Sequence, residues 1–463
     1  MHAFDTLVIG GGLSGIAAGV ALARAGRRIA LFEADAVLGG RASSEVDPVT
    51  GDAIAIGPHV LFSEYANMLA LLRLLGTESR VVWDRERFST EVRGTRELVT
   101  RMAPLPAPFH FVPSLVADPT LRTRDWLSNA GVTLFVLSLD DNALLSLDDL
   151  RGIDILRRLR VSEAYIDRFW RYLALAIVNL PLEKCSAAAL LRAYRRLVGK
   201  RGYRVGYPDG GLGDLFAPAA ERFLRERGSL VRTSARVVEI DGAYRVTLAS
   251  GETFEAPSCV VALPPNALRA LLPHETAGRF EAVPYVSVHL WFDRKLTTLP
   301  FWSRVYDAGD VNLDFYDFSN IGSRGGASLI ASNIIGAERI GDRSDEEIVR
   351  VTLAELAEFL PEAAEARVVH RVVRRIPMAI HAAVPGSERL RPRAIEFRTR
   401  LVLAGDWMQT GLPPSMESAC YSGFRAAETL LGIRGIAQQH RELDPLASLL
   451  GAATRGMRSV FGP

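Results

Sequence analysis

A glycine-rich turn near the start of the chain has the spacing of a phosphate-binding loop. Gly10, Gly12 and Gly15 follow a short apolar, β-branched run and precede an Ala- and Leu-rich stretch. In such a strand–turn–helix unit the first glycine permits the tight turn and the second lets the backbone approach a pyrophosphate. The third lets helix and strand pack closely. The N–H groups at the start of the helix, near Leu13 and Ser14, and the positive end of its dipole would hold the phosphates.

An acidic residue lies where such a site would bind a ribose. Glu33 stands at the end of the next predicted strand, residues 28–32, with Ala34 beside it. Its carboxylate is expected to accept hydrogen bonds from an adenosine ribose, and its charge disfavours a 2′-phosphate. A purely structural glycine turn is the alternative interpretation. The strand before the turn, the helix after it and the placing of Glu33 together favour a dinucleotide.

A second glycine pair follows Glu33 closely. Gly39 and Gly40 would allow another close backbone approach, and Arg41, followed by Ala42, would bring a cation to the same pyrophosphate. A guanidinium suits phosphate because of its fork of donors. The alternative interpretation is a solvated arginine beside a flexible turn.

These residues resemble the FAD-binding signature of the amine oxidase and carotenoid desaturase superfamily. Residues 403–407, 414–419 and 422–423 are similar to the C-terminal flavin motif of that superfamily. The resemblance implies that Asp406, after Gly405, bonds the ribityl chain. It also implies that the helix beginning near Ser415 and Met416 points its N-terminus at the flavin pyrimidine, where it would stabilise negative charge. The strand that carries Val238 would contact the adenine.

A third motif narrows the resemblance. Gly57, Pro58 and His59 resemble the Gly-x-His segment of plant-type phytoene and zeta-carotene desaturases and of hydroxysqualene dehydroxylases. Residues 176–187 are most similar to the dehydroxylases, whereas residues 384–386 and 391–392 resemble the desaturases. The family usually has an acid two residues before the glycine of this segment, but this chain has Ala55 there. Asp52 is the candidate to replace that acid.

Several residues allow both a functional and a structural interpretation. His59 could position a substrate or move a proton beside the flavin, or it could only pack and hydrogen-bond. The apolar residues 173–178 could line a lipid tunnel, lie near a membrane or form a core helix. A basic cluster could meet anionic lipid headgroups or form a solvated helix face. It consists of Arg192, Arg195, Arg196, Lys200, Arg201 and Arg204.

The resemblance implies an FAD-dependent oxidoreductase that transfers hydride at flavin N5 and acts on a long apolar isoprenoid. The reaction would be hydroxysqualene dehydroxylation or carotene desaturation, with a quinone or another electron carrier as partner in the second. A flavin amine oxidase that produces hydrogen peroxide is the alternative. Residues 410–412 stand where an amine oxidase usually has a tyrosine, which weakens that alternative. A flavin-binding protein without catalysis is a third class.

The pattern of elements predicts an α/β fold with a discontinuous Rossmann-like FAD-binding domain and an inserted α+β substrate domain. We expect the FAD-binding domain in residues 1–75, 205–268 and 392–435. The substrate-binding domain is expected in residues 76–204 and 269–391, and a C-terminal tail in 436–463.

Composition sets the remaining expectations. The 55 Lys and Arg nearly balance the 53 Asp and Glu, which leaves a net charge of +2 and argues against nucleic acid as the ligand. Three cysteines far apart favour a reducing compartment and give no metal cage. Without a signal peptide or a long apolar run, the expected location is the cytoplasm, with contact at the cytoplasmic membrane surface left open. The sequence does not predict an oligomeric state.

Overall fold

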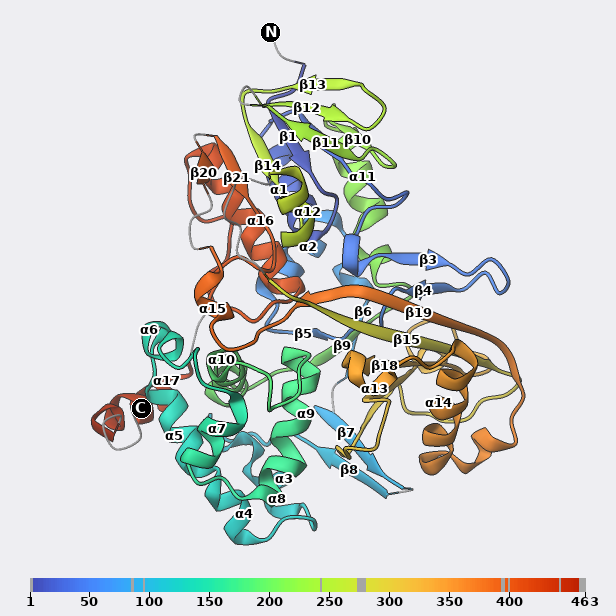
Figure 1. The fold of residues 1–463 in the computed structure, drawn as a ribbon, viewed down its shortest axis with the longest axis vertical. Coiled ribbons are helices and arrows are strands. Elements are labelled where there is room, and N and C mark those ends of the chain that lie inside the picture. Colours follow the sequence, from blue (N-terminus) through green and yellow to red (C-terminus); the bar gives the residue numbers. More distant parts are fainter. Residues whose placement is uncertain are drawn as a thin grey trace.

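The computed structural model describes most of the chain. The described residues are 3–84, 87–94, 96–241, 244–272, 280–392, 396–398, 400–440 and 443–457. In Figure 1 a parallel sheet with its helices forms the upper part of the molecule. A group of helices lies at the lower left, and a second, larger sheet crosses to the right.

The first sheet has six strands in the order β10-β2-β1-β14-β21-β20. Neighbouring strands are parallel except for β20 at the edge, which is antiparallel to β21. The strands are β1 (Thr6–Ile9), β2 (Ile29–Phe32), β10 (Leu230–Arg232), β14 (Cys259–Val261), β20 (Glu396–Arg398) and β21 (Leu401–Leu403). The polypeptide returns to this sheet from widely separated parts of the sequence, so one core joins both ends of the chain.

The side chains of β1 point alternately to the two faces of this sheet, one of which is covered by helices and the other by a small sheet. Val8 points into the core formed with α1 (Leu13–Arg24), α2 (Ala66–Leu75), α11 (Ala217–Arg225) and α16 (Met416–Leu431). Leu7 and Ile9 point the opposite way, into a core with α12 (Pro265–Leu271) and a three-stranded antiparallel sheet. That sheet contains β11 (Val237–Ile240), β12 (Arg245–Leu248) and β13 (Thr253–Glu255).

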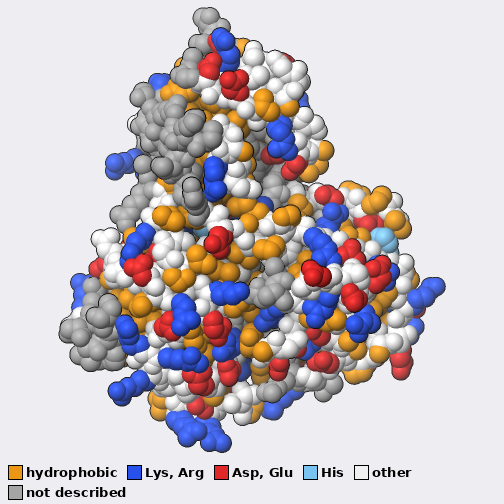
Figure 2. All heavy atoms as spheres, viewed as in Figure 1, with side chains coloured by type: hydrophobic (Ala, Val, Ile, Leu, Met, Phe, Trp, Pro, Cys, Tyr) orange, Lys and Arg blue, Asp and Glu red, His pale blue; other side chains and the backbone are white. Residues whose placement is uncertain are grey.

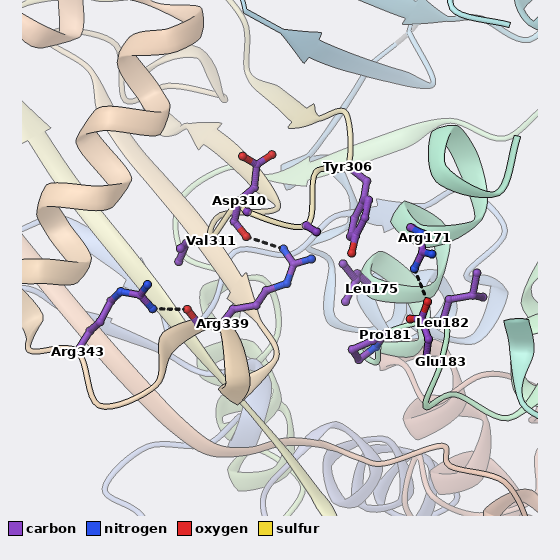
Figure 3. A pocket seen from close by; sticks show the side chains of 12 residues that line it. Arg171, Leu175, Pro181, Leu182, Glu183, Tyr306, Asp310, Val311, Arg339 and Arg343 are labelled. Carbon is purple, nitrogen blue, oxygen red and sulfur yellow. Dashed lines mark hydrogen bonds and ion pairs between the residues drawn. The ribbon is translucent and has the colours of Figure 1, made fainter. Parts of the chain in front are cut away.

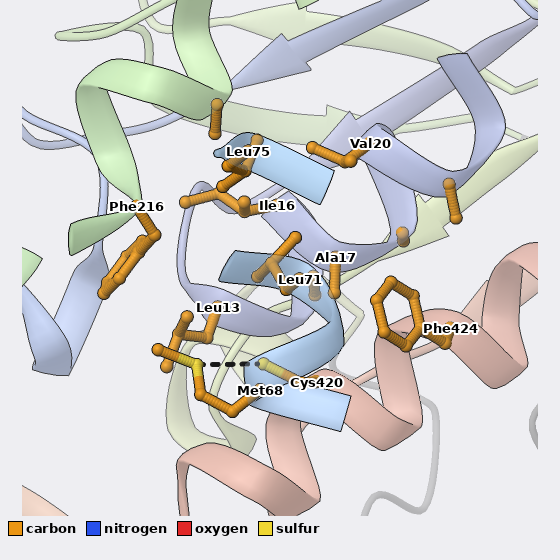
Figure 4. Packing of buried hydrophobic residues seen from close by; sticks show 14 of the residues in the cluster. Leu13, Ile16, Ala17, Val20, Met68, Leu71, Leu75, Phe216, Cys420 and Phe424 are labelled. Atoms are coloured by element: carbon orange, nitrogen blue, oxygen red, sulfur yellow. Dashed lines mark hydrogen bonds between the residues drawn. The ribbon is translucent and has the colours of Figure 1, made fainter. Parts of the chain in front are cut away.

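Helix α1 lies at the centre of the first core (Figure 4). Its residues are buried from Leu13 to Ala23, because small side chains let neighbouring helices approach on several sides. A Cβ at Gly423 of α16 would lie 2.2 Å from the carbonyl oxygen of Ser14, so these two helices touch backbone to backbone. The first turn of α1 therefore packs directly on the middle of α16.

The second large sheet has seven strands in the order β19-β15-β18-β17-β16-β7-β8. All neighbours are antiparallel except β16 and β7. The strands are β7 (Ser89–Arg93), β8 (Arg96–Thr100), β15 (Ala282–Phe292), β16 (Phe301–Arg304), β17 (Asp314–Asp317), β18 (Leu329–Ile335) and β19 (Val368–His381). One face packs on α14 (Asp345–Phe359), near which lies the short α13 (Ala337–Ile340). The other face contacts residues 54–62.

Two smaller sheets connect the large ones. One is the hairpin of β3 (Ser44–Val46) and β4 (Ala53–Ala55), and the other has the order β5-β9-β6. Its strands are β5 (Leu61–Phe62), β9 (Val205–Pro208) and β6 (Val81–Trp83).

A separate apolar core holds the helices at the lower left of Figure 1. They are α3 (Val112–Ala117), α4 (Thr123–Ser128), α5 (Ala130–Ser138), α6 (Asp141–Leu145), α7 (Gly152–Arg158), α8 (Glu163–Tyr165), α9 (Arg171–Leu173), α10 (Ala187–Gly199) and α17 (Pro445–Ala453). The short α15 (Ser387–Leu390) joins this region to the end of β19. Helix α17, from the C-terminal segment, packs on α5, where a Cβ at Gly451 would lie 2.2 Å from the carbonyl oxygen of Leu137.

The surface is of mixed charge, and the basic cluster of the sequence is not one solvated face. On the face shown in Figure 2, cationic and anionic side chains are interspersed. Arg192, Arg195 and Lys200 are buried, with exposed fractions of 4%, 9% and 8%. Lys200 Nζ lies 2.6 Å from a carboxylate oxygen of Glu64, and Arg192 is paired with Glu388. The interpretation of the cluster as a lipid-headgroup site is therefore wrong for these three residues.

Among the described residues, no helix combines the length and the apolar character needed to cross a bilayer.

Candidate functional site

The turn between β1 and α1 has the backbone of a phosphate-binding loop. Gly10 has φ +101°, a conformation that favours glycine. Gly12 caps the N-terminus of α1 without any side-chain hydrogen bond, and the first turn of the helix contains no acid. Leu13 and Ser14 open the helix. The first turn of α1 thus supplies no anion to the positive end of the helix dipole, although the Glu33 carboxylate binds the Gly11 N–H just before the cap.

The three glycines differ in what surrounds them. A Cβ at Gly15 would lie 1.9 Å from the carbonyl oxygen of Gly10, so only glycine lets the helix meet the turn. A Cβ at Gly12 would meet no protein atom within 4 Å. Space is left at Gly12 where a pyrophosphate would approach the backbone, and this fits the dinucleotide prediction.

Glu33 is held beside this turn. Its Oε2 accepts a hydrogen bond of 2.6 Å from the Gly11 N–H, and its Oε1 accepts one of 2.9 Å from the Asp35 N–H. The side chain is buried, and Ala34 follows it in a half-buried position. The carboxylate therefore has a fixed place at the end of β2, adjacent to the glycine turn.

The second glycine pair lies against the first. Gly39 donates its N–H to the carbonyl oxygen of Gly11 at 2.8 Å. A Cβ at Gly40 would lie 3.3 Å from the Cα of Gly12, and Gly40 opens the short helical turn that ends at Ala42. Two glycine segments thus form adjoining walls of the same space.

Arg41 and Asp406 meet although they are 365 residues apart in the sequence. An Arg41 guanidinium nitrogen donates to Asp406 Oδ1 at 2.6 Å, and another donates to the carbonyl oxygen of Ala379 at 3.2 Å. Burial raises the pKa of Asp406, but the charge and hydrogen bond of Arg41, together with other positive charges that include Arg391, hold the pKa below its usual value. Asp406 is therefore ionised. Arg41, which is predicted to contact the pyrophosphate, and Asp406, which is predicted to contact the ribityl chain, thus lie side by side.

The C-terminal motif brings a second helix N-terminus to this cluster. Gly405 follows β21 and donates its N–H to Ser422 Oγ at 2.9 Å. Ser415 caps α16, because its Oγ accepts a hydrogen bond of 3.2 Å from the Ser418 N–H. Ser418 Oγ in turn donates to the carbonyl oxygen of Asp406 at 3.1 Å. Met416 is the first residue of the helix.

The Gly57-Pro58-His59 segment lies against the face of the seven-stranded sheet. Asn333 of β18 donates to the carbonyl oxygen of Pro58 at 3.2 Å. A Cβ at Gly57 would overlap the Tyr285 hydroxyl, at 1.2 Å, so this glycine permits the contact. His59 Nδ1 lies 2.6 Å from the Gly57 carbonyl oxygen, and burial together with the Arg41 charge lowers the pKa of His59. His59 is consequently a neutral imidazole near Arg41, and its part in catalysis stays a prediction.

The positions of Val238 and Asp52 bear on two further predictions. Val238 stands at a register shift between β11 and β12 and its side chain is 51% exposed, and its contact with an adenine stays a prediction. Asp52 does not stand in for the acid missing at Ala55. Its oxygens bind Arg324 at 2.9 Å and the indole N–H of Trp291 at 2.6 Å.

A buried arginine to which the sequence pattern assigned no role shapes the C-terminal motif. Arg391 donates hydrogen bonds to the carbonyl oxygens of Asp406, Met408 and Leu412 at 3.1, 2.7 and 3.0 Å. Its charge is balanced by Glu388 at 3.0 Å. Arg391 was part of a motif match, but the match gave no role, because the carbonyl partners depend on tertiary folding.

A neutral histidine completes the surroundings of Asp406. His381, at the end of β19, is buried, and burial lowers its pKa to about 4. Among the described residues, no three His, Cys, Asp or Glu side chains converge as metal ligands.

Comparisons with known proteins agree with this geometry. The fold matches wild-type putrescine oxidase bound to putrescine with a TM-score of 0.72 at 18% identity, covering 93% of this chain and 99% of that one. The chain is 26% identical to 15-cis-phytoene desaturase of Synechococcus elongatus, over 95% of this chain and 98% of that protein. It is 25% identical to the probable zeta-carotene desaturase of the same organism, over 93% and 99%.

A family model describes nearly the whole chain. The flavin containing amine oxidoreductase model matches residues 13–431, from the first turn of α1 to the last turn of α16. The matched stretch thus contains Glu33, the second glycine pair and the C-terminal motif. The chain belongs to this family and is an FAD-dependent oxidoreductase related to the carotenoid desaturases.

Proposed function

We propose that the enzyme acts by hydride transfer on a long apolar isoprenoid, in a carotene desaturation or a hydroxysqualene dehydroxylation. The observation that carries the proposal is the similarity to phytoene and zeta-carotene desaturases over almost the full length of both chains. The similarity to putrescine oxidase is a similarity of fold and says nothing of the substrate.

Each part of the cluster has a proposed task toward FAD. The glycine turn and the N-terminus of α1 would hold the pyrophosphate, and Glu33 would bind the adenosine ribose. Asp406 would bond the ribityl chain, and the N-terminus of α16 would stabilise negative charge on the ring system. Bound FAD supplies hydride exchange at its N5 atom.

An apolar layer supports a lipid-like substrate. Leu175, Leu313 and Ile335 are buried together between the helical segment after α9 and the seven-stranded sheet. This layer adjoins a cavity of about 370 Å³ that is open to the surface. Figure 3 shows Leu175 beside Tyr306, with Arg171 and Glu183 on one side of them and Arg339 and Val311 on the other. The lining of this cavity includes the charged side chains of Arg171, Glu183, Asp310, Arg339 and Arg343, so the apolar surface for an alkyl chain comes mainly from the adjoining layer.

The layer leads toward the predicted flavin face. Ile335 is opposite Tyr285 in the β15–β18 ladder, and the Tyr285 hydroxyl meets Gly57. On this proposal an isoprenoid chain would run along the layer from Leu175 past Ile335 toward the Gly57-Pro58-His59 segment. In the oxidative reaction a quinone or another electron carrier would be the electron acceptor.

The test is the mass of the products from FAD-loaded protein. Phytoene and partly desaturated carotenes are offered under oxidising conditions, and hydroxysqualene is offered under reducing conditions. Loss of hydrogen pairs identifies a desaturase, and loss of oxygen with reductant identifies a dehydroxylase. Unchanged isoprenoids, together with peroxide formed from an amine panel, would replace the proposal by the amine oxidase alternative.

A further inference from the structure

The cavity of about 370 Å³ has a lining rich in arginine. It is bounded by Leu175 of the segment after α9 and by residues 306–311 of the loop between β16 and β17. Its three cationic side chains are Arg171, Arg339 and Arg343. None of its lining residues belongs to the glycine turns, the Gly57-Pro58-His59 segment or the C-terminal motif. The cavity is therefore separate from the predicted FAD cluster.

The two carboxylates that line this cavity are already paired with arginines. Glu183 lies 2.5 Å from an Arg171 nitrogen, and Arg171 also pairs with Asp167 at 2.7 Å. Asp310 lies 2.7 Å from an Arg304 nitrogen. These ion pairs neutralise Arg171, so its charge is not available to a ligand.

The other two arginines are held by carbonyl oxygens instead. Arg339 donates to the carbonyl oxygen of Asp310 at 2.9 Å. Arg343 donates to the carbonyl oxygens of Arg339 and Ile340 at 2.6 and 3.0 Å. The Arg339 guanidinium also lies 5.3 Å from the centre of the Tyr306 ring, as Figure 3 shows from close by. In the described part of the chain neither guanidinium has a carboxylate partner, so both are fixed in place with their charges uncancelled.

Such a pair of guanidinium groups suits the oxygens of a phosphate, which a fork of N–H donors can bind in a bidentate manner. The cavity adjoins the apolar layer of Leu175, Leu313 and Ile335 through Leu175, which belongs to both. A bare phosphate would leave this layer unused, and a pure hydrocarbon would leave the two cations unused. A ligand with a phosphate head and an apolar chain would use both.

We infer that this cavity binds the phosphate or diphosphate group of an amphiphile, at Arg339 and Arg343, while its apolar chain lies along the layer. The phosphate site stands on the geometry of the cavity alone. That the chain is an isoprenoid rests on the proposed function. The same chemistry could come from a soluble prenyl diphosphate or from a phospholipid.

Farnesyl diphosphate, farnesol and inorganic diphosphate test the two parts of the ligand. Isothermal titration calorimetry measures their affinities for FAD-loaded protein, in which the pyrophosphate site of FAD is occupied. Farnesyl diphosphate should bind at least about tenfold more tightly than farnesol, because only it reaches the two arginines with an anion. It should also bind at least about tenfold more tightly than inorganic diphosphate, because its chain is removed from water.

Arginine variants test the site itself. Arg339→Gln and Arg343→Gln should each weaken binding of farnesyl diphosphate about tenfold and leave farnesol binding unchanged. Arg343→Lys should lose less, because it keeps the charge and loses only the fork. Arg350→Gln is the matched control, since Arg350 is exposed on α14 and lies outside the cavity lining. It removes the same charge and should leave every affinity unchanged. The flavin spectrum and the unfolding temperature show that each variant is folded.

Vesicles of phosphatidylcholine with and without phosphatidic acid separate the two sources of the phosphate group. Binding of farnesyl diphosphate assigns a soluble ligand. Binding only to vesicles with phosphatidic acid, with the same loss in Arg339→Gln and Arg343→Gln, assigns a phospholipid.

Several results would overturn the inference. They are equal affinity for farnesyl diphosphate and farnesol, full affinity in both glutamine variants, an equal loss in Arg350→Gln, and release of FAD by farnesyl diphosphate. Inorganic diphosphate that binds as tightly as farnesyl diphosphate would remove the apolar chain from the ligand. Arginine-dependent binding together with unchanged isoprenoids in the product assay would refute the proposed function and not this site, so the two failures are distinguishable.

Discussion

Alanine at two glycines of the same turn should separate ligand binding from folding. At Gly15 the new Cβ would lie 1.9 Å from the Gly10 carbonyl oxygen, whereas real contacts of this kind stay beyond 3.0 Å. Backbone must shift by about 1 Å, and such overpacking costs about 1–3 kcal/mol of unfolding free energy. At Gly12 the Cβ meets nothing within 4 Å and φ is −73°, so Gly12→Ala should cost less than about 1 kcal/mol.

For FAD binding the two variants should rank the other way, with the larger effect in Gly12→Ala. A methyl group at Gly12 occupies the space of the approaching pyrophosphate and removes charge-assisted hydrogen bonds worth about 1.5–3 kcal/mol each. The dissociation constant for FAD should rise at least about tenfold in Gly12→Ala. Urea denaturation of FAD-free protein measures stability, and quenching of flavin fluorescence measures FAD binding. Wild-type FAD affinity in Gly12→Ala would refute the placing of the pyrophosphate, and wild-type stability in Gly15→Ala would refute the steric argument.

Three further predictions concern buried charges. The pKa of Asp314 is raised from 3.8 to about 7 by burial, so its neutral form favours folding at low pH. Up to about 4 kcal/mol of unfolding free energy should be lost between about pH 4 and pH 7; denaturation series at several pH values should show this loss in wild type and not in Asp314→Asn. Arg391→Met should cost about 3–5 kcal/mol in urea denaturation, because it leaves Glu388 buried without that partner and frees three carbonyl oxygens; a cost below about 1 kcal/mol would contradict the role assigned to Arg391. Glu33→Ala should lower the flavin-to-protein absorbance ratio of purified protein, and full flavin retention would count against its ribose contact.

Local sequence patterns were sufficient for the phosphate-binding turn. The conformations of Gly10 and Gly12 depend on a strand, a turn and a helix that are neighbours in the chain, so spacing and residue type predict them. The same holds for Ser415, which caps α16 as its place before the helix suggests. Asp52 and Arg192 were misjudged because their partners, Arg324 and Glu388, come from distant segments.

The sequence by itself determined that this chain folds into an α/β flavoprotein of the amine oxidoreductase family, because its two end motifs are local and specific. Tertiary structure alone decided that Arg41 meets Asp406, that Arg391 holds the C-terminal motif, and that Asp314 lies buried near Pro58. The Arg41–Asp406 contact joins residues 365 apart and the Asn333–Pro58 contact joins residues 275 apart, whereas the Arg391 contacts span 15 to 21 residues of irregular chain. Periodicity carries no information on any of these pairs. The packing of the sheets against each other determines which face of a sheet a carboxyl group lies on and whether a hydrogen-bond partner is present there.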